Sequence, residues 1–419
     1  MSTEEPKTVE DDFDFLGDIE APVTIAAAPR VLEDECGNTA FKFCFVGLGQ
    51  AGGRMVEAFW KLGYRRVAAI NTAHQDLDTL DIPKENQLLL TGTDGLDGAG
   101  KDMTRAKEIA DQGRERILDH LLKCGFDANF DRVLVCLGTG GGTGGGTSVT
   151  VLEVIHELLE SMQATSRVKV GVMASLPATS EGRRVCANAC ECLDHLLKSA
   201  ATGRGREAVR AISPLILVDN SRISKLYPGV SAGSFWASAN STIARMFHLY
   251  NKTAATVSSH TSFDSRDYQD VLDSGLITFG SCNMASWENP TDISDAIRQH
   301  LASNVLVANT DLRSASVAGC VFIGSERVMD QVPQDHLEQG FKMLDRMMGG
   351  GSTVHRGVYS LGPRNSLTAY TILGGLNAPV ETTAALAKHG EWWPSLPGAV
   401  KPAPVDHPPQ REDVAESGT

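Results

Sequence analysis

The most informative segment of this chain is Arg132-Val-Leu-Val-Cys-Leu-Gly-Thr-Gly-Gly-Gly-Thr-Gly-Gly-Gly-Thr-Ser-Val149. Its apolar start, 133–137, is typical of a strand buried on both faces. Seven of the nine residues in 138–146 are glycine, and apolar residues then recur with helical spacing over 149–159. A strand, a glycine loop and a helix in this order present unpaired N–H groups and a positive helix end to an anion. The segment therefore predicts a phosphate site rather than a flexible linker.

Length and composition indicate a globular protein of two or three domains. The chain has 419 residues, 42% of them hydrophobic and 21% charged, and its net charge of −14 argues against broad affinity for nucleic acids. The nine cysteines lack zinc-type spacing and several lie in apolar runs, which favours reduced thiols. The sequence contains neither a signal peptide nor a long apolar run, so we expect a cytoplasmic protein without a transmembrane segment.

Strands and helices alternate over the first half of the chain, which predicts an α/β fold with a doubly wound parallel sheet. A ligand of such a sheet binds at the carboxyl ends of the strands, where every glycine loop of this sequence falls. The expected elements are strand 41–46, loop 47–53, helix 55–62, strand 67–70, loop 91–101, helix 103–123, strand 168–173, helix 181–198 and strand 215–218.

A long helix is expected over 232–257, and about 26 helical residues would span about 39 Å, enough to run between two domains. A second, smaller α+β domain follows it. Residues 1–40 are acidic, and those from 377 onwards are polar and proline-rich, so both ends are predicted to be disordered tails. The elements expected in the second domain are strand 276–280, helix 293–301, strand 317–323, helix 336–348 and strands 353–360 and 368–373.

The first glycine loop, Gly47-Leu-Gly-Gln-Ala-Gly-Gly53, matches the pattern GxGxxG, which is a weak signal on its own. A nicotinamide-binding fold would place an acid at the end of the next strand to bind the ribose. Asn71 and Thr72 stand there instead. The loop therefore favours another nucleotide, and a nicotinamide-dependent oxidoreductase is kept as the less favoured alternative.

Together these segments resemble the tubulin/FtsZ superfamily of filament-forming GTPases, in the right order from about residue 41 to 376. The clearest match is Gly140-Gly-Gly-Thr-Gly-Gly-Gly146, against the family pattern GGGTG[ST]G. The first loop is more similar to the archaeal CetZ branch, and the last domain to FtsZ. The resemblance implies an acidic tail (1–40), a GTP-binding domain (41–231), a central helix (232–259), a C-terminal activation domain (260–376) and a second tail (377–419).

The resemblance implies that GTP or GDP is bound, with Mg²⁺ as the accompanying ion, whose protein ligands it leaves open. Glu181 would bind the ribose, although an acid at a helix start is also favoured by the helix dipole. The positions that match nucleotide contacts of the family are Gly49, Gln50, Ala51, Gly52, Asn71, Thr72, Gly98, Ala99, Gly100, Gly140, Gly141, Gly142, Thr143, Gly144, Glu181, Asn220, Trp236 and Asn240.

Trp236 and Asn240 lie four residues apart and therefore share one face of the expected helix. In the family an aromatic ring stacks on guanine here, and a polar side chain four residues later binds its edge. A lone tryptophan is more often a core residue, but the polar partner favours base contact. Phe235 is the weaker candidate, because its equivalent partner, Ala239, cannot form a side-chain hydrogen bond.

Asp264 and Asp267 match the acids of a loop that, in the family, reaches the nucleotide of the next subunit. A carboxylate can orient and polarise a water for attack on the terminal phosphate. The alternative is that these acids cap the helix that follows them. Gly145, Val185 and Ser262 depart from the family pattern, and 199–210 is an apparent insertion containing Arg204, Arg206 and Arg210.

We expect a GTPase that polymerises head to tail and hydrolyses GTP at the subunit interface, in the prokaryotic cytoskeleton or in cell division. The departures also motivate an alternative, a nucleotide-binding filament protein with little or no hydrolysis. The expected partner is a second copy of the chain, an adaptor at the terminal tails is a further candidate, and nucleic acid is not expected.

Overall fold

One mixed sheet runs through the protein in the computed structural model, which describes residues 36–126, 129–165, 167–201, 211–227, 229–231, 233–301, 306–307, 309–361 and 365–392. Its strands are β1 (Phe43–Leu48), β2 (Val67–Asn71), β3 (Gln87–Leu89), β4 (Arg132–Gly138), β5 (Lys169–Leu176), β6 (Ile212–Asp219), β7 (Leu276–Met284), β8 (Val317–Gly324), β9 (Thr353–Ser360) and β10 (Leu367–Gly374). Their order is β3-β2-β1-β4-β5-β6-β7-β10-β8-β9. Neighbours from β3 to β7 are parallel, whereas β10 is antiparallel to both of its neighbours.

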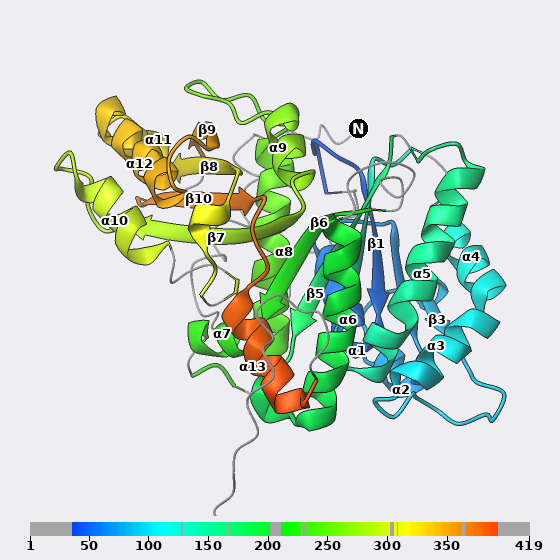
Figure 1. The fold of residues 1–419 in the computed structure, drawn as a ribbon. Helices are drawn as coiled ribbons and strands as arrows, with labels where there is room; N and C mark the ends of the chain where they lie inside the picture. Colours follow the sequence, from blue (N-terminus) through cyan, green and yellow to red (C-terminus); the bar gives the residue numbers. More distant parts are fainter. Residues whose placement is uncertain are drawn as a thin grey trace, which may run out of the picture.

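Helices cover both faces of the parallel part (Figure 1). They are α1 (Gly49–Lys61), α2 (His74–Asp78), α3 (Met103–Gln112), α4 (Arg114–Lys123), α5 (Gly142–Ser161), α6 (Arg183–Ala201), α7 (Asn220–Leu226), α8 (Phe235–Thr253), α9 (Ser265–Leu272), α10 (Asp292–His300), α11 (Glu326–Met329), α12 (Gln334–Met347) and α13 (Val380–Gly390). Phe43 and Phe45 of β1 pack with Phe247 of α8, while the alternate residues Cys44 and Val46 face the opposite core. This two-sided burial confirms the predicted doubly wound α/β fold.

The two glycine segments that the sequence predicts as loops are largely helical, because α1 begins at Gly49 and α5 at Gly142. Close backbone packing explains the glycines. A Cβ on Gly52 would lie 2.1 Å from the carbonyl oxygen of Cys136, and one on Gly146 would lie 2.4 Å from that of Met103. Most of these glycines thus allow a helix to lie against other backbone.

Two predicted helices have different limits in the structure. The helix expected over 103–123 is divided into α3 and α4 at Gly113, whose N–H donates to the carbonyls of both Ile109 and Ala110. The central helix α8 has 19 residues and spans about 28 Å, which is shorter than the expected 232–257. A turn closed by the N–H of Ser234 and the carbonyl of Ser231 precedes it.

The chain beyond residue 377 forms α13, so the prediction of a disordered tail is wrong for its first part. Leu386 and Ala387 are buried in the same core as Leu193 of α6. A Cβ on Gly390 would lie 2.7 Å from the backbone nitrogen of Ala187, so the two helices touch. The helix has 11 residues, and its buried ones (Thr383, Leu386, Ala387 and Gly390) include one large apolar side chain, which is why composition gave no signal for it. The predictions for 1–35, 202–210 and 393–419 lie outside the described residues.

Two further features concern the cysteines and the lengths of the helices. All nine cysteines lie within the described residues, and all are free thiols. Burial raises the pKa of several of these thiols, that of Cys282 to about 11. Across the described ranges, no helix is both long and apolar enough to span a membrane.

Candidate nucleotide-binding site

Two helices begin side by side without a side-chain cap. The N-cap residues of α1 and α5 are Leu48 and Gly141, and neither makes a side-chain hydrogen bond. Neither first turn contains an acid. By contrast, α3 and α9 begin at Asp102 and Asp264, whose carboxylates accept backbone N–H groups. Unpaired N–H groups and the positive ends of two helix dipoles therefore make the starts of α1 and α5 suitable for an anion.

The two helix starts touch each other. A Cβ on Gly49 would lie 3.0 Å from the backbone nitrogen of Gly144 and 3.3 Å from Cβ of Thr143, and the φ angle of Gly49 is +67°. A Cβ on Gly141, in contrast, would meet no atom within 4 Å. Strands β1 and β4, which lead into these helices, are neighbours at the point where the strand order reverses. This is where ligands of open α/β sheets bind.

Residues after β2 complete this edge of the site. The hydroxyls of Thr72 and Thr143 lie 2.7 Å apart. The carboxylate of Asp76 accepts hydrogen bonds from Gln50 Nε2 at 2.7 Å and from Asn71 Nδ2 at 3.1 Å. The predicted residues Gln50, Asn71, Thr72 and Thr143 are thus brought together. Asp76 was missed from the sequence, because its role depends on contacts across separate segments.

The loop that precedes α3 is fastened to the end of β2. The N–H of Gly98 donates to the carbonyl of Thr72 at 2.8 Å, and Gly98 and Gly100 have φ angles of +79° and +58°. The N–H of His74 donates to Asp97 at 2.9 Å, and its ring Nδ1 lies 3.0 Å from the same carboxylate. These bonds from the His74 backbone and ring hold the pKa of Asp97 below its usual value. The predicted Gly98, with Ala99 and Gly100 after it, therefore lies beside Thr72.

Asn188 of α6 joins this loop to the glycine segment. Its Nδ2 donates to the carbonyl of Lys101 at 3.0 Å and to that of Gly140 at 3.2 Å. The sequence gave no signal for Asn188, which lies 87 and 48 residues from these two partners. A Cβ on Gly142 would lie 2.9 Å from Cα of Lys101, so the loop covers the start of α5.

The positions that depart from the family pattern have local explanations. A Cβ on Gly145 would lie 3.1 Å from the sulfur of Met103, so a methionine fills the space beside it. Val185 packs against Gly140. Its neighbour Arg184 pairs with Asp102, the N-cap of α3, at 3.4 Å.

Glu181 and Asn220 lie together at the ends of β5 and β6. Asn220 Nδ2 donates to Glu181 Oε1 across 3.4 Å. The same carboxylate oxygen accepts the N–H of Ala178 at 2.8 Å, so Glu181 also stabilises the short turn that it ends. The position of Glu181 is therefore compatible both with ribose binding and with a structural role at the helix start. Its contact with a ribose remains a prediction.

Trp236 and Asn240 occupy the first two turns of α8. Trp236 is 37% exposed, and its ring meets that of Phe235 edge-on, with ring centroids 4.9 Å apart. Phe235 turns towards Tyr227, at a centroid distance of 6.4 Å, so it is the more internal of the two rings. This leaves Trp236 as the accessible aromatic surface near the start of α8. Base contact by Trp236 and Asn240 stays a prediction.

Asp264 and Asp267 lie apart from the other candidate residues. They begin α9, after the end of α8, at the opposite end of the sheet from α2 and the start of α1 (Figure 1). Asp264 Oδ1 accepts the N–H groups of Arg266 and Asp267 at 2.8 and 3.0 Å, and Asp267 Oδ2 accepts that of Asp264 at 3.2 Å. The capping role that the sequence left open is therefore present. Within one molecule these acids are remote from the glycine segments.

The site offers oxygen ligands for Mg²⁺ but no closed metal site. Within the described residues, no three His, Cys, Asp or Glu side chains gather as metal ligands. The Asp76 carboxylate and the Thr72 and Thr143 hydroxyls are the hard donors that Mg²⁺ prefers. Phosphate oxygens and water would have to supply the rest of its coordination.

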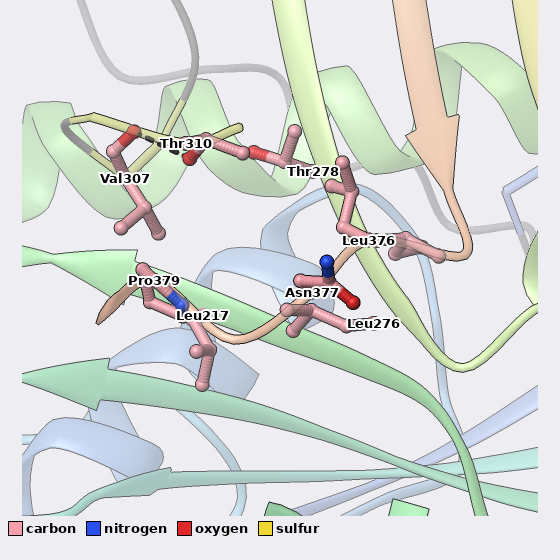
Figure 2. Close-up of a pocket in the computed structure, with 9 residues that line it drawn as sticks. Leu217, Leu276, Thr278, Val307, Thr310, Leu376, Asn377 and Pro379 are labelled. Atoms are coloured by element: carbon pink, nitrogen blue, oxygen red, sulfur yellow. Dashed lines mark hydrogen bonds between the residues drawn. The ribbon is translucent and has the colours of Figure 1, made fainter. Parts of the chain in front are cut away.

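A separate pocket lies where β6 meets β7 (Figure 2). In the register of these two strands, Leu215 pairs with Leu276 and Ile216 with Ile277. The lining contains no charged side chain, so the pocket does not suit a phosphate. Its lining residues are Leu217, Leu276, Ile277, Thr278, Val307, Thr310, Leu376, Asn377 and Pro379.

Comparisons with known proteins agree with this geometry. Residues 42–203 match the Tubulin/FtsZ family, GTPase domain. The chain is 24% identical to the cell division protein FtsZ of Porphyromonas gingivalis over 316 residues, which cover 74% of this chain and 61% of that protein. It therefore spans less than two thirds of this relative. It is also 24% identical to the tubulin-like protein CetZ2 of Haloferax volcanii, over 80% of this chain and 88% of CetZ2.

The whole fold also has a close solved counterpart. A GTPγS-form protofilament of TubZ from Bacillus thuringiensis serovar israelensis matches with a TM-score of 0.72 and 20% identity, covering 85% of this chain and 93% of that one. At this identity the match speaks for the fold alone. The chain is therefore similar in sequence, over residues 42–203, to the GTPase domain of the Tubulin/FtsZ family, and similar in fold to a TubZ protofilament subunit.

Proposed function

We propose that this protein binds GTP at the α1 and α5 helix starts, polymerises head to tail, and hydrolyses the GTP between subunits. The observation that carries the proposal is the contact of two uncapped helix ends at Gly49 and Gly144, beside the open position Gly141. Two positive helix ends at one point suit the several negative charges of a triphosphate. Glu181, Asn220, Trp236 and Asn240 are assigned to the ribose and base.

The separation of the acids from this site supports the head-to-tail arrangement. Helix α8 begins near the nucleotide edge and has 19 residues, so its far end lies about 28 Å away. Asp264 follows that far end and cannot reach a phosphate bound at Gly141 of its own molecule. In a head-to-tail stack, Asp264 of one subunit faces the nucleotide edge of the next. Each active site then needs two subunits.

The reaction follows from this arrangement. A water oxygen attacks the terminal phosphorus, and the bond from that phosphorus to the oxygen bridging to the β-phosphate breaks. The products are GDP and inorganic phosphate, which takes up the proton that the water loses. Asp264 would orient the water and polarise it, while backbone N–H groups of the glycine segments stabilise charge on the phosphates. Mg²⁺, when bound, neutralises part of the phosphate charge.

The cellular role proposed is that of a cytoskeletal or cell-division filament. The known proteins that the chain resembles include a cell division protein and filament-forming TubZ. The same proposal includes an adaptor protein that binds the terminal tails.

Phosphate release measured against protein concentration tests this function. Turnover per molecule should be near zero below a critical concentration and rise steeply above it, with filaments visible by electron microscopy only in the second range. Guanine nucleotide should co-purify with the protein. Turnover that is independent of concentration would contradict the shared site, and filaments without phosphate release would favour the binding-only alternative. Bound nicotinamide would contradict GTP binding itself.

A further inference from the structure

The segment that leads into α9 is attached to β9, the edge strand of the sheet. The Tyr359 hydroxyl donates to the carbonyl of Thr253 at the end of α8, at 3.0 Å, and accepts the N–H of Phe263 at 2.9 Å. Thr261 forms an antiparallel bridge with Val358. One strand of the second domain therefore fixes the backbone immediately before Asp264.

Phe263 anchors the same segment by packing. It is fully buried, and a Cβ on Gly319 or Gly357 would lie 2.7 or 3.0 Å from its side chain. The ring therefore fills a slot that exists because two neighbouring strands carry glycine there. Asp264, the next residue, is exposed, so its backbone is held by the buried Phe263 while its side chain faces outward.

His355 of β9 holds the second acid. Its Nδ1 lies 2.7 Å from Asp267 Oδ1, and the His355 side chain is only 15% exposed. Its Nε2 is buried, has no hydrogen-bond partner among the described residues, and lies 3.7 Å from Asp270 Oδ2. Because a carboxylate only accepts, Nδ1 must carry the proton in this contact. The imidazole is thus hydrogen-bonded to Asp267 and lies beside Asp270.

Asp264 and Asp267 differ in whether a carboxylate oxygen is left unbonded by the described residues. Both oxygens of Asp267 are engaged, Oδ1 with His355 and Oδ2 with the N–H of Asp264. Asp264 uses only Oδ1, which accepts two N–H groups. Its Oδ2 makes no hydrogen bond to any described residue and belongs to an exposed side chain. Only Asp264 therefore offers an unengaged oxygen to a neighbouring molecule.

We propose that His355 is a positioning residue for hydrolysis. Through Asp267 it fixes the first turn of α9, so that Asp264 Oδ2 is aimed outward at the water on the adjoining subunit's nucleotide. This inference rests on the proposed function and assigns a different role to each of the two acids. Asp264 acts on the water, and Asp267 with His355 orients Asp264.

The test compares His355→Leu, which removes the contact, with His355→Asn, whose amide N–H can take the place of Nδ1. His355→Leu should lower the phosphate-release rate of fully assembled protein about tenfold, with GTP affinity and critical concentration within about twofold of the wild type. His355→Asn should recover most of the rate. His260→Asn is the matched control, because His260 also contacts β9, through Ser360 at 3.1 Å, but touches neither acid.

The outcomes separate this inference from the function that it rests on. A wild-type filament without turnover overturns the proposed function and the inference with it. Normal turnover in His355→Leu, or equal losses in the Leu and Asn variants, overturns the inference alone. Nitrogen NMR of labelled histidine reads the same contact without filaments. A proton on Nδ1 whose signal shifts in Asp267→Asn supports the hydrogen bond from His355 to Asp267, and an unprotonated Nδ1 overturns it.

Discussion

Arg132 Nη2 donates to Asp273 Oδ1 across 2.8 Å, joining the first residue of β4 to the C-cap residue of α9. The Arg132 side chain is only 4% exposed, and its guanidinium lies 5.0 Å from the centroid of the Phe41 ring. Strand β4 carries the glycine segment at its other end. This ion pair therefore makes β4, which leads into the glycine segment, and α9, which follows Asp264, parts of one packed unit.

Removing this pair from one side should be costly. Asp273→Ala leaves a buried guanidinium without its partner, and we expect a loss of about 2–3 kcal/mol in the free energy of unfolding, reduced because Asp273 is 31% exposed. Denaturant unfolding measures it. The control is Asp295→Ala, which breaks the exposed pair with Arg298 and should cost under about 0.5 kcal/mol. Equal losses in the two variants would show that Arg132 is not held by Asp273.

Two glycines at the start of α5, the N-cap Gly141 and Gly144, should respond differently to alanine. In Gly144→Ala the new Cβ would lie 2.5 Å from the carbonyl oxygen of Gly138, so we expect about 2–3 kcal/mol of destabilisation. In Gly141→Ala the Cβ enters open space, so stability should be unchanged. GTP affinity in this variant should fall about tenfold, or about 1.4 kcal/mol. Thermal unfolding and nucleotide titration separate the two effects, and unchanged affinity in Gly141→Ala would remove this position from the phosphate site.

The free energy of unfolding should fall in mild acid because His248 is buried in its neutral form. Burial lowers the pKa of this imidazole from 6.5 to about 3, helped by the nearby positive charge of Lys252. The unfolded chain therefore takes up a proton below pH 6.5 that the folded chain takes up only near pH 3. The free energy of unfolding should fall by about 2 kcal/mol between pH 7 and pH 5 from this group.

The matched variant for that pH effect is His248→Gln. Its amide can still bond the Tyr64 hydroxyl, which lies 3.0 Å from His248 Nδ1 in the wild type. The variant should show a smaller loss on acidification. His120 and His195, whose pKa values burial also lowers, would account for the remainder. An unchanged pH profile in the variant would contradict this assignment.

Trp236 should report nucleotide binding directly. If its exposed face stacks on the base, Trp236→Ala should weaken GTP binding by about 1–3 kcal/mol, and GTP should change the tryptophan fluorescence of the wild type. Trp60→Phe provides the control, because Trp60 lies under the guanidinium of Arg65 at 4.3 Å. A fluorescence response that persists in Trp236→Ala would place the base elsewhere.

The sequence was sufficient for what depends on local pattern. The expected strand 353–360 coincides with β9, and both glycine segments lie at the carboxyl ends of neighbouring strands. Contacts between distant segments could not be read in this way. Asp76 and Asn188 join the site through hydrogen bonds to residues of other segments. Helix α13 is stabilised by packing against α6, which its own sequence does not reveal. The helical start of α5 was missed because glycine is intrinsically a poor helix former.

The most direct test of the shared active site is the distance from the Asp264 carboxylate to the terminal phosphate in a filament. Electron cryo-microscopy of filaments grown with a slowly hydrolysed GTP analogue would measure it. We predict that Asp264 lies about 6 Å or less from the phosphate of the adjoining subunit, within reach of one bridging water, and more than about 20 Å from its own. Filaments in which Asp264 faces solvent or a lateral neighbour would contradict the account.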